Sequence, residues 1–302
     1  MRLGLKVDVD TLGGLKEGVP ALLDILGERG LTASFFLALG PDNSGRAIFR
    51  VFTQEGFLEK MLRTRAPSVY GLTTMLYGTL LPAPVIAAAA PAIVPAIVAA
   101  GHEVGMHGFD HVRWHDRLVK MSYEEIAGQV RAAQEVFLAT LSHPAVSFAA
   151  PGWQATKASR DVLADQGFLY ASDTRGEGPY WPRFGNTVTP LLEIPTTLPT
   201  LDELLGFQGC DAQDYYRLIA KRLSPARPQV LTLHAELEGG PFRVSFASFL
   251  DEALGRGVTF FRLIDWAGEL TGNLEALPAC PISLRRLPGR AGRVACQVTG
   301  AT

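Results

Sequence analysis

Short apolar runs alternate along the chain with longer segments whose apolar residues recur every three or four positions. The short runs predict buried strands at residues 3–7, 33–39, 103–106, 147–150, 169–172, 192–195, 230–233 and 258–261. The longer segments predict helices at residues 20–29, 122–141, 156–166, 211–223 and 246–256. Such alternation is typical of an α/β fold with a parallel sheet, and both a barrel and an open doubly wound sheet fit it.

Two stretches interrupt this alternation. Residues 45–84 are too long for an ordinary connection, and we expect them to form an insertion. Residues 271–302 follow the last predicted helix and are rich in proline and arginine. The pattern therefore predicts one barrel-like unit over residues 1–270 and a poorly ordered C-terminal tail over residues 271–302.

The apolar stretch at residues 80–100 has the length of a membrane span. It contains the prolines Pro82, Pro84, Pro91 and Pro95. Proline removes helical hydrogen bonds that lipid cannot replace, so we expect instead a helix near residues 85–100 that ends at Gly101. Lys6 and Asp8 interrupt the apolar start of the chain, which argues against a secretion signal and favours a cytoplasmic protein.

Composition narrows the classes of partner and cofactor. Hydrophobic residues make up 47% of the 302 residues, enough for a sizeable core. Lys and Arg number 28 against 30 Asp and Glu, so the net charge of −2 offers no general attraction to nucleic acid. The three cysteines form no Cys-x-x-Cys, and no Gly-x-Gly-x-x-Gly or Walker loop supports a nucleotide-binding fold.

Ionisable side chains collect where predicted strands end. The residues concerned are Asp8, Asp10, His107, His111, Asp173 and His234. The other predicted strand interiors are nearly free of charge. Since the carboxyl ends of parallel strands share one face of the sheet, these side chains are expected to form one site.

A metal centre is the chemistry that this set favours. His107 and His111 are four residues apart, so on one helical turn both imidazoles would face a divalent ion, with Asp10 as a carboxylate ligand. Asp8 is then free to act as a base. The alternatives are two histidines on a helix surface and an Asx turn around the two aspartates.

His234 follows an apolar strand and is either a hydrogen-bonded core residue or a general acid, and its place on the common face favours the acid. Asp173 could orient His234 and raise its pKa, or could pair with Arg175 as a structural ion pair.

The chain contains the motifs Asp-x-Asp, His-x3-His, Pro-Gly, Asp and Leu-x-His in this order. In these motifs and their order it resembles the NodB-type polysaccharide deacetylases. That resemblance covers about residues 2–270 and implies a distorted (β/α) barrel and a metal-dependent amide hydrolase. It also implies one role for each position: Asp8 as catalytic base, Asp10, His107 and His111 as metal ligands, His234 as general acid, and Asp173 as the residue that orients the acid. The metal would be one divalent ion, with zinc, manganese, cobalt and iron all compatible.

Two features depart from the family pattern. Val9 separates the two aspartates, which many members have adjacent, and Ala149 and Ala150 stand before Pro151 where an arginine usually braces the base. Arg175 is the expected substitute for that arginine. We place Pro151, Gly152, Trp153 and Arg175 in the substrate-binding part of the site.

Seven segments narrow the resemblance to a branch of the family that removes a formyl group from undecaprenyl-phosphate-linked 4-formamido-4-deoxy-L-arabinose. They are residues 4–11, 17–23, 40–46, 102–107, 172–176, 194–203 and 234–239. This resemblance implies a step of lipid A modification linked to polymyxin resistance, and a polyprenyl-phosphate sugar as substrate. Two alternatives stay open: an N-deacetylase of another amino sugar or small amide, and a catalytically dead barrel that binds glycan or lipid.

The insertion at residues 45–84 mixes basic and apolar side chains, a composition suited to an anionic membrane surface. We expect Arg46, Arg50, Phe52 and Arg63 to contact lipid, and the protein to associate peripherally with the cytoplasmic side of the bacterial inner membrane. The alternative is a helical hairpin that packs on the barrel and exposes a solvated basic face.

Overall fold

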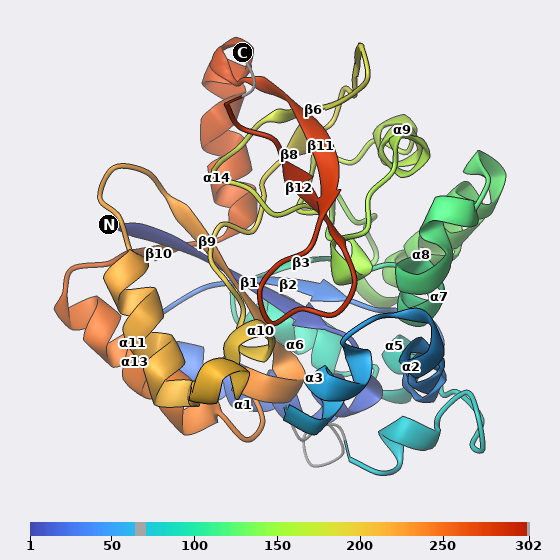
Figure 1. Ribbon diagram of the computed structural model, residues 1–302, viewed down its shortest axis with the longest axis horizontal. Coiled ribbons are helices and arrows are strands. Elements are labelled where there is room, and N and C mark those ends of the chain that lie inside the picture. The colour runs from blue at the N-terminus through green and yellow to red at the C-terminus, as the bar shows by residue number, and fades with distance from the viewer. Residues whose placement is uncertain (64–70, 301–302) are drawn as a thin grey trace.

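The computed structural model describes residues 1–63 and 71–300. Its central element is a curled sheet of eight strands, all joined by parallel pairings. Helices surround this sheet (Figure 1). The strands are β1 (Arg2–Val9), β2 (Ser34–Leu37), β3 (Glu103–Met106), β4 (Ser147–Phe148), β5 (Tyr170–Ala171), β8 (Leu192–Glu193), β9 (Gln229–His234) and β10 (Thr259–Phe261).

β1 is the longest strand of this sheet. Residues 3–9 are all buried, and the strand pairs with β2, β9 and β10. From β2 the sheet continues through β3, β4 and β5 to β8. The backbone N–H groups of Thr197 and Leu198, just after β8, donate to the carbonyl of Val230 in β9, which brings the two ends of the curl together. The distorted barrel is thus confirmed, and the open doubly wound sheet is excluded.

Several helices begin where side chains satisfy their free N–H groups. Capping boxes open the predicted helices at Ser122, Thr156 and Asp211. The main helices on the barrel are α1 (Val19–Gly27), α6 (Ile93–Ala99), α8 (Tyr123–Leu141), α9 (Lys157–Asp165), α11 (Ala212–Arg222), α13 (Arg243–Gly255) and α14 (Leu263–Leu270). Shorter ones are α5 (Ile86–Ala89), α7 (His111–Arg117), α10 (Leu201–Leu204) and α12 (Ala235–Glu238).

The apolar stretch at residues 80–100 forms two short helices, α5 and α6, rather than one. Gly101 follows α6 with φ of +84°, a conformation that suits glycine at a helix end. In the part of the chain that the structure describes, no helix is long and apolar enough to cross a bilayer.

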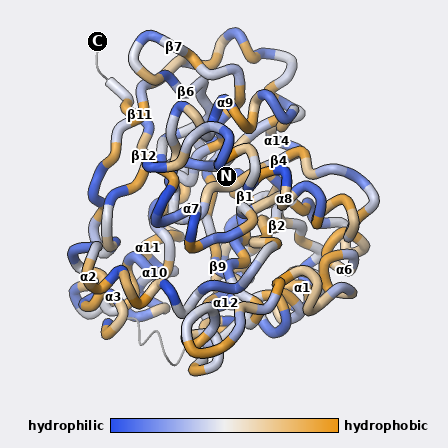
Figure 2. The backbone as a smooth tube through the Cα atoms, turned by 90° about the vertical axis from the view of Figure 1, so that its right-hand side faces the viewer, coloured by the Kyte–Doolittle hydropathy of each residue, from blue (hydrophilic) through white to orange (hydrophobic). Residues whose placement is uncertain are grey.

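The insertion contains the 3₁₀ turns Ser44–Phe49 and Thr74–Leu76 and the helices α2 (Arg50–Thr53) and α3 (Phe57–Arg63). α3 lies beside α10 in two views (Figures 1 and 2). Arg63 at its end donates to the carbonyls of Leu205 and Gly289, so this side chain points into the protein. The expectation that Arg63 contacts lipid is therefore wrong, because backbone carbonyls already take up its guanidinium.

The C-terminal segment is ordered, contrary to the expected tail. Its strands β11 (Ala279–Arg285) and β12 (Val294–Gln297) pair antiparallel and join β6 (Trp181–Phe184) and β7 (Thr187–Val188) in a second sheet. The hairpin crosses in front of the barrel in Figure 1. Val294 and Cys296 pack against Trp153 at the barrel mouth. The prediction of a poorly ordered tail from its proline and arginine content is therefore wrong. A few buried apolar side chains of β12 hold this segment against the barrel.

Val294→Ala should lower the free energy of unfolding by about 1–3 kcal/mol, because it leaves a cavity between β12 and Trp153. Urea denaturation measures this loss. Val188→Ala is the control, since Val188 is 45% exposed on β7 and its truncation should change stability by less than about 0.5 kcal/mol. A poorly ordered tail would instead make the two variants indistinguishable.

Candidate active site

Five of the six residues predicted at the strand ends meet in one cavity of about 470 Å³, and Asp173 is not among its lining residues. Asp8 lies in β1 and Asp10 directly after it, while His107 follows β3 and His234 ends β9. His111 is the first residue of α7. All five side chains line the same cavity. The expectation from parallel strand ends thus accounts for the position of the site.

Asp10, His107 and His111 form a cluster that could hold a metal ion, with their ligand atoms all within 4.8 Å of one another. Asp10 Oδ1 is 3.2 Å from His107 Nε2 and 3.5 Å from His111 Nε2. The two histidines are not on one helical turn as predicted. His107 stands before the turn at Gly108, whose φ is +80°, and His111 after it, so the turn rather than the helix brings the imidazoles together.

The protonation states of these groups suit a cation. His107 Nδ1 lies 2.8 Å from the carbonyl of Ala149, which assigns the proton to Nδ1 and leaves Nε2 as a donor to metal. Burial lowers the pKa of His111 to about 4, so this imidazole is neutral at pH 7. Burial opposes the charge on Asp10, but His111 and His107 together hold the pKa of its carboxyl below the usual value. Burial opposes the charge on His107, but Asp8 and Asp10 raise its pKa, and a metal ion at Nε2 would take the place of the second proton. A largely enclosed carboxylate with two imidazoles is a donor set that fits a divalent metal ion.

Lys6 is the cation that stands beside Asp8. Its Nζ lies 3.4 Å from Asp8 Oδ2 and donates to the carbonyl of Ser172, and the whole side chain is buried in β1. Asp8 Oδ1 has no hydrogen-bond partner among the described residues. The expected substitute, Arg175, instead pairs with Glu203 and lies over the ring of Trp153. Lys6 thus occupies the place beside the candidate base that the motif comparison predicts for Arg175.

Asp202, not Asp173, faces His234. Asp202 Oδ1 lies 3.7 Å from His234 Nδ1. Burial opposes the charge on Asp202, but Lys60 and His234 hold the pKa of its carboxyl well below the usual range. Asp173 Oδ2 instead accepts a hydrogen bond of 2.9 Å from Arg160. The assignment of Asp173 to His234 is therefore wrong, because a buried arginine holds its carboxylate elsewhere.

The Pro-Gly-Trp segment forms a turn at residues 151–153, which brings Trp153 to the cavity wall. Trp153 donates from Nε1 to Thr196 Oγ1 and meets His234 edge-on, with the ring centroids 6.3 Å apart. Gly152 has φ of +62°, and a Cβ there would lie 2.0 Å from His115. Close packing against α7 therefore requires glycine at this position.

Comparison with known proteins agrees with this arrangement. A family model described as polysaccharide deacetylase matches residues 5–171. The chain belongs to the polysaccharide deacetylase family. This membership confirms the resemblance drawn from the motifs and makes the chain a hydrolase acting on an amide.

Two relatives extend the similarity beyond the matched domain. A protein of Shewanella sediminis, described as a probable 4-deoxy-4-formamido-L-arabinose-phosphoundecaprenol deformylase ArnD, is 36% identical over 264 residues, which cover 87% of this chain and 85% of the relative. A protein of Wigglesworthia glossinidia brevipalpis with the same description is 31% identical and covers 94% of this chain and 98% of its own. A solved structure described as a probable polysaccharide deacetylase from Pseudomonas aeruginosa shares the fold, with a TM-score of 0.62 at 18% identity over 90% of this chain and 92% of that one.

Three residues of this deacetylase site escaped the sequence reasoning. In the sequence Lys6 interrupts an apolar run within the family-like segment 4–11, and Asp202 lies within the family-like segment 194–203 but at no predicted strand end. The third is Glu236, whose Oε1 accepts hydrogen bonds from the backbone N–H groups of Asp10 and Thr11. Glu236 follows the predicted His234 by two residues, and this adjacency was the one available clue to its role in shaping the loop.

His111→Ala should lower the affinity for a divalent metal by about 100-fold or more, because it removes one of three clustered donors, a larger change than loss of an outer-shell partner. Elemental analysis of dialysed protein measures the bound metal. Asp8→Asn is the matched control and should retain metal, since Asp8 is outside the cluster. One equivalent of metal in the His111→Ala protein would contradict the assignment.

Proposed function

We propose that this deacetylase hydrolyses the formamide of a 4-formamido-4-deoxy-L-arabinose carried on undecaprenyl phosphate, releasing formate. The two relatives with this described activity cover most of the chain and motivate the choice of substrate. The observation that supports it best in the structure is the composition of the cavity. One wall carries Asp8, Asp10, His107, His111 and His234, and another carries apolar residues of the insertion and α12.

The apolar wall suits a lipid-linked sugar. Its side chains are Ile48, Phe49, Phe57, Met61, Met75, Leu76 and Leu237. Six of them belong to the insertion, so a segment added to the barrel supplies most of this surface. A free amino sugar would present mainly hydroxyl groups and would gain little from such a wall. An N-deacetylase of a small polar amide is therefore the weaker alternative.

Each ionisable residue has one part in the proposed mechanism. When bound by Asp10, His107 and His111, a divalent metal ion would supply a Lewis acid that polarises an amide carbonyl and lowers the pKa of water. Asp8 takes the proton of the attacking water, using the buried oxygen that lacks a protein partner. Lys6 holds the other oxygen of Asp8. Asp8 therefore acts as the base, and Asp10 acts as the metal ligand.

The departing amine requires a proton, which His234 donates as the carbon–nitrogen bond breaks. Its Nδ1 is turned toward Asp202, which leaves Nε2 for the substrate. Asp202 is a positioning residue in this scheme, since it acts through His234. The products are formate and the free amine, so one water is consumed and all atoms balance.

Asp8→Asn and His234→Ala should each lower kcat for formate release by about 10²- to 10⁴-fold while the protein still binds metal, because each removes a proton-transfer group. Undecaprenyl-phospho-4-formamido-4-deoxy-L-arabinose is the substrate, and formate is measured with and without chelator. The acetamido analogue, assayed alongside, tests the alternative acyl group.

Wild-type turnover in either variant would contradict the assigned roles. Failure of the folded, metal-loaded wild-type protein to release formate would contradict the proposed substrate. Faster cleavage of the acetamido analogue would favour the deacetylase alternative.

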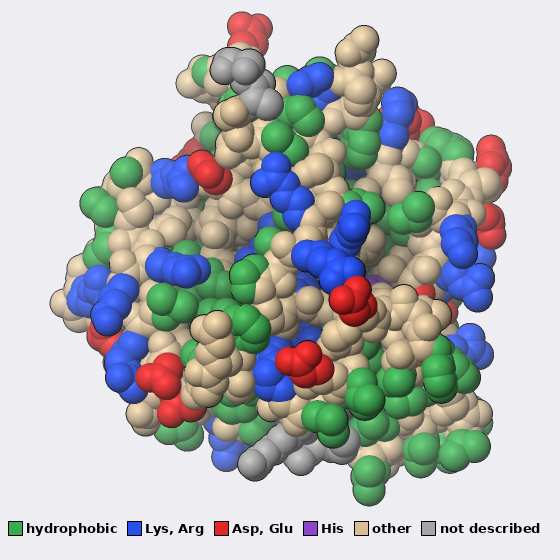
Figure 3. All heavy atoms as spheres, in the orientation of Figure 1, with side chains coloured by type: hydrophobic (Ala, Val, Ile, Leu, Met, Phe, Trp, Pro, Cys, Tyr) green, Lys and Arg blue, Asp and Glu red, His purple; other side chains and the backbone are tan. Residues whose placement is uncertain are grey.

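We also propose that the insertion rests on the cytoplasmic surface of the inner membrane. Large apolar side chains are exposed there, with Phe52 at 85%, Leu62 at 71% and Leu80 at 81% exposure. Hydrophobic side chains gather at the lower right of Figure 3, where Figure 1 places α2 and α5. Arg46 donates to the carbonyl of Gly78 and is exposed beside them. Arg50 does not belong to this surface, since its side chain is only 11% exposed and pairs with Asp116.

Phe52→Ser combined with Leu62→Ser should reduce binding to anionic vesicles by about tenfold or more, because two large apolar side chains are lost from the lipid contact. Vesicle flotation measures the bound fraction. Val244→Ser, at a 72% exposed position on α13, is the control and should bind as the wild type does. Equal flotation of all three proteins would rule out this surface.

A further inference from the structure

Two arginines from opposite ends of the chain reach the catalytic cavity. Arg50 begins α2, and Arg290 lies in the loop between β11 and β12. Both line the cavity that contains Asp8 and His234. Their side chains are nearly enclosed, with 11% of Arg50 and 8% of Arg290 exposed. Enclosed guanidinium groups are costly unless an anion accompanies them, so their partners are informative.

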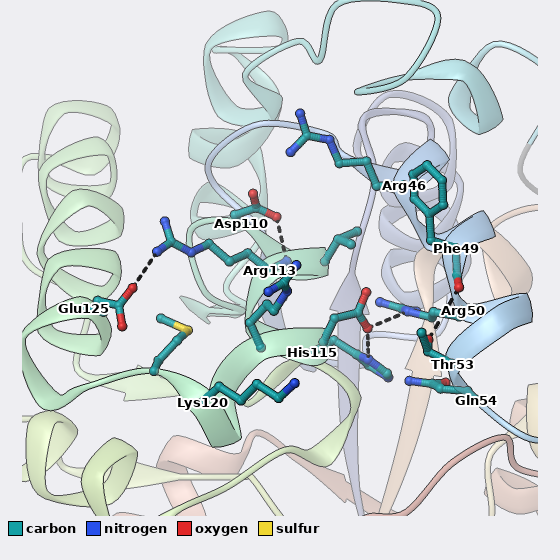
Figure 4. A pocket seen from close by; sticks show the side chains of 14 residues that line it. Arg46, Phe49, Arg50, Thr53, Gln54, Asp110, Arg113, His115, Lys120 and Glu125 are labelled. Atoms are coloured by element: carbon teal, nitrogen blue, oxygen red, sulfur yellow. Dashed lines mark hydrogen bonds and ion pairs between the residues drawn. The ribbon is translucent and has the colours of Figure 1, made fainter.

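Arg50 has one strong protein partner. Its Nε donates to Asp116 Oδ1 at 2.7 Å, as the dashed line in Figure 4 marks. The same carboxylate oxygen lies 2.8 Å from His115 Nδ1, so Arg50 shares it. Its Nη2 is buried and has no hydrogen-bond partner among the described residues. One donor of this guanidinium therefore lacks an acceptor.

Arg290 is also incompletely paired. Its Nη1 is 3.7 Å from Glu203 Oε1, an oxygen that also accepts from Arg175. The guanidinium lies 4.4 Å from the centroid of the Trp153 ring, and its Nε is buried with no acceptor in the described part of the chain. Stacking on Trp153 fixes the plane of the guanidinium without using its N–H groups. Both arginines thus retain donors for a further acceptor.

The two charges also act on each other. Burial lowers the pKa of Arg50, and the charge of Arg290 lowers it further, although Asp116 opposes both. Two cations that repel across an enclosed space gain when an anion binds between them. Guanidinium groups match phosphate oxygens with two parallel hydrogen bonds, which a lysine cannot do.

We propose that Arg50 and Arg290 form a phosphate subsite, which holds the phosphodiester that links the sugar to its polyprenol. This inference rests on the proposed function. The formamide at one end of the sugar would face the histidines, and the phosphate at the other end would face the arginines. The polyprenol chain would then extend out of the cavity along the apolar side chains of the insertion.

The neighbouring pocket shares Arg50 with the catalytic cavity but lacks Arg290, so it does not offer the same pair of arginines. It has a volume of about 790 Å³ and also contains Arg46, Arg113 and Lys120 (Figure 4). Arg113 pairs with Glu125 and is 45% exposed, and Arg46 is exposed and bonded to a backbone carbonyl. These cations are solvated at a surface, whereas the two proposed phosphate ligands are enclosed. Arg113 therefore serves as a matched control.

Kinetics on two substrates tests the subsite. Arg50→Gln and Arg290→Gln should each raise KM for the undecaprenyl-phosphate-linked sugar by about tenfold or more, since a charge-assisted hydrogen bond is lost. The loss on the phosphate-free methyl glycoside of the same sugar should be clearly smaller. Arg113→Gln should match the wild type on both substrates. Equal losses on both substrates, or no loss on the lipid-linked one, would overturn the proposal.

Binding separates this inference from the proposed function. Undecaprenyl phosphate should bind the wild-type protein and change its tryptophan fluorescence, because Trp153 lies under Arg290. Arg50→Gln and Arg290→Gln should weaken this binding, and Arg290→Lys should restore part of it. If the wild type releases formate but undecaprenyl phosphate does not bind, the subsite fails and the function stands. If no formate is released but the binding pattern holds, the function fails and the subsite stands.

A second arm identifies the source of the phosphate. Phosphatidylglycerol vesicles and inorganic phosphate are added as competitors of undecaprenyl phosphate. The proposal expects weak competition from both, since neither places a polyprenyl phosphate in the cavity. Competition by the vesicles as strong as that by unlabelled undecaprenyl phosphate would overturn it in favour of a general headgroup site. Thermal unfolding of every variant shows that each protein is folded.

Discussion

A lysine and an aspartate two residues apart share the buried interior of the central strand, and the catalytic geometry depends on that pair. Taking two charges out of water costs several kcal/mol per ion, which the mutual attraction of Lys6 and Asp8 must offset. Because alternate residues of a strand point to the same face, both side chains lie inside the curl of the barrel. The pair fixes Asp8 where the ends of β3 and β9 bring their histidines.

Other buried carboxylates at the mouth of the barrel are held, unlike Asp8, by groups that are distant from them in sequence. Arg160 of α9 binds the carboxylates of both Asp173 and Glu193. Asp173 follows β5 and Glu193 lies in β8, so this arginine links the ends of two strands. Glu236 receives the backbone N–H groups after β1. Each contact ties one strand end to another. The rigidity of the site therefore comes from polar links across the mouth of the barrel rather than from the strands alone.

The periodicity of the sequence predicted the barrel strands and most of its larger helices because local burial and capping determine them. The strand-end rule also found Asp8, Asp10, His107, His111 and His234. It could not find the partners of these residues, since pairing depends on three-dimensional neighbours: it chose Asp173 where Asp202 stands, and Arg175 where Lys6 stands. The tail was misjudged for the same reason, because the strands β6 and β7 that it joins were not predicted.

The cavity wall is built from segments that are far apart in the chain, and this affects the order in which the site assembles during synthesis. Its catalytic face is complete once β9 has formed, but its outer rim joins α2 near the start of the chain to a hairpin that ends at residue 297. The ribosome delivers that hairpin after β9. Until then, the metal ligands can assemble around an open cavity in which Trp153 lacks its cover of Val294 and Cys296. The nascent enzyme thus acquires its chemistry before it acquires its selectivity, and the hairpin made after β9 closes the site.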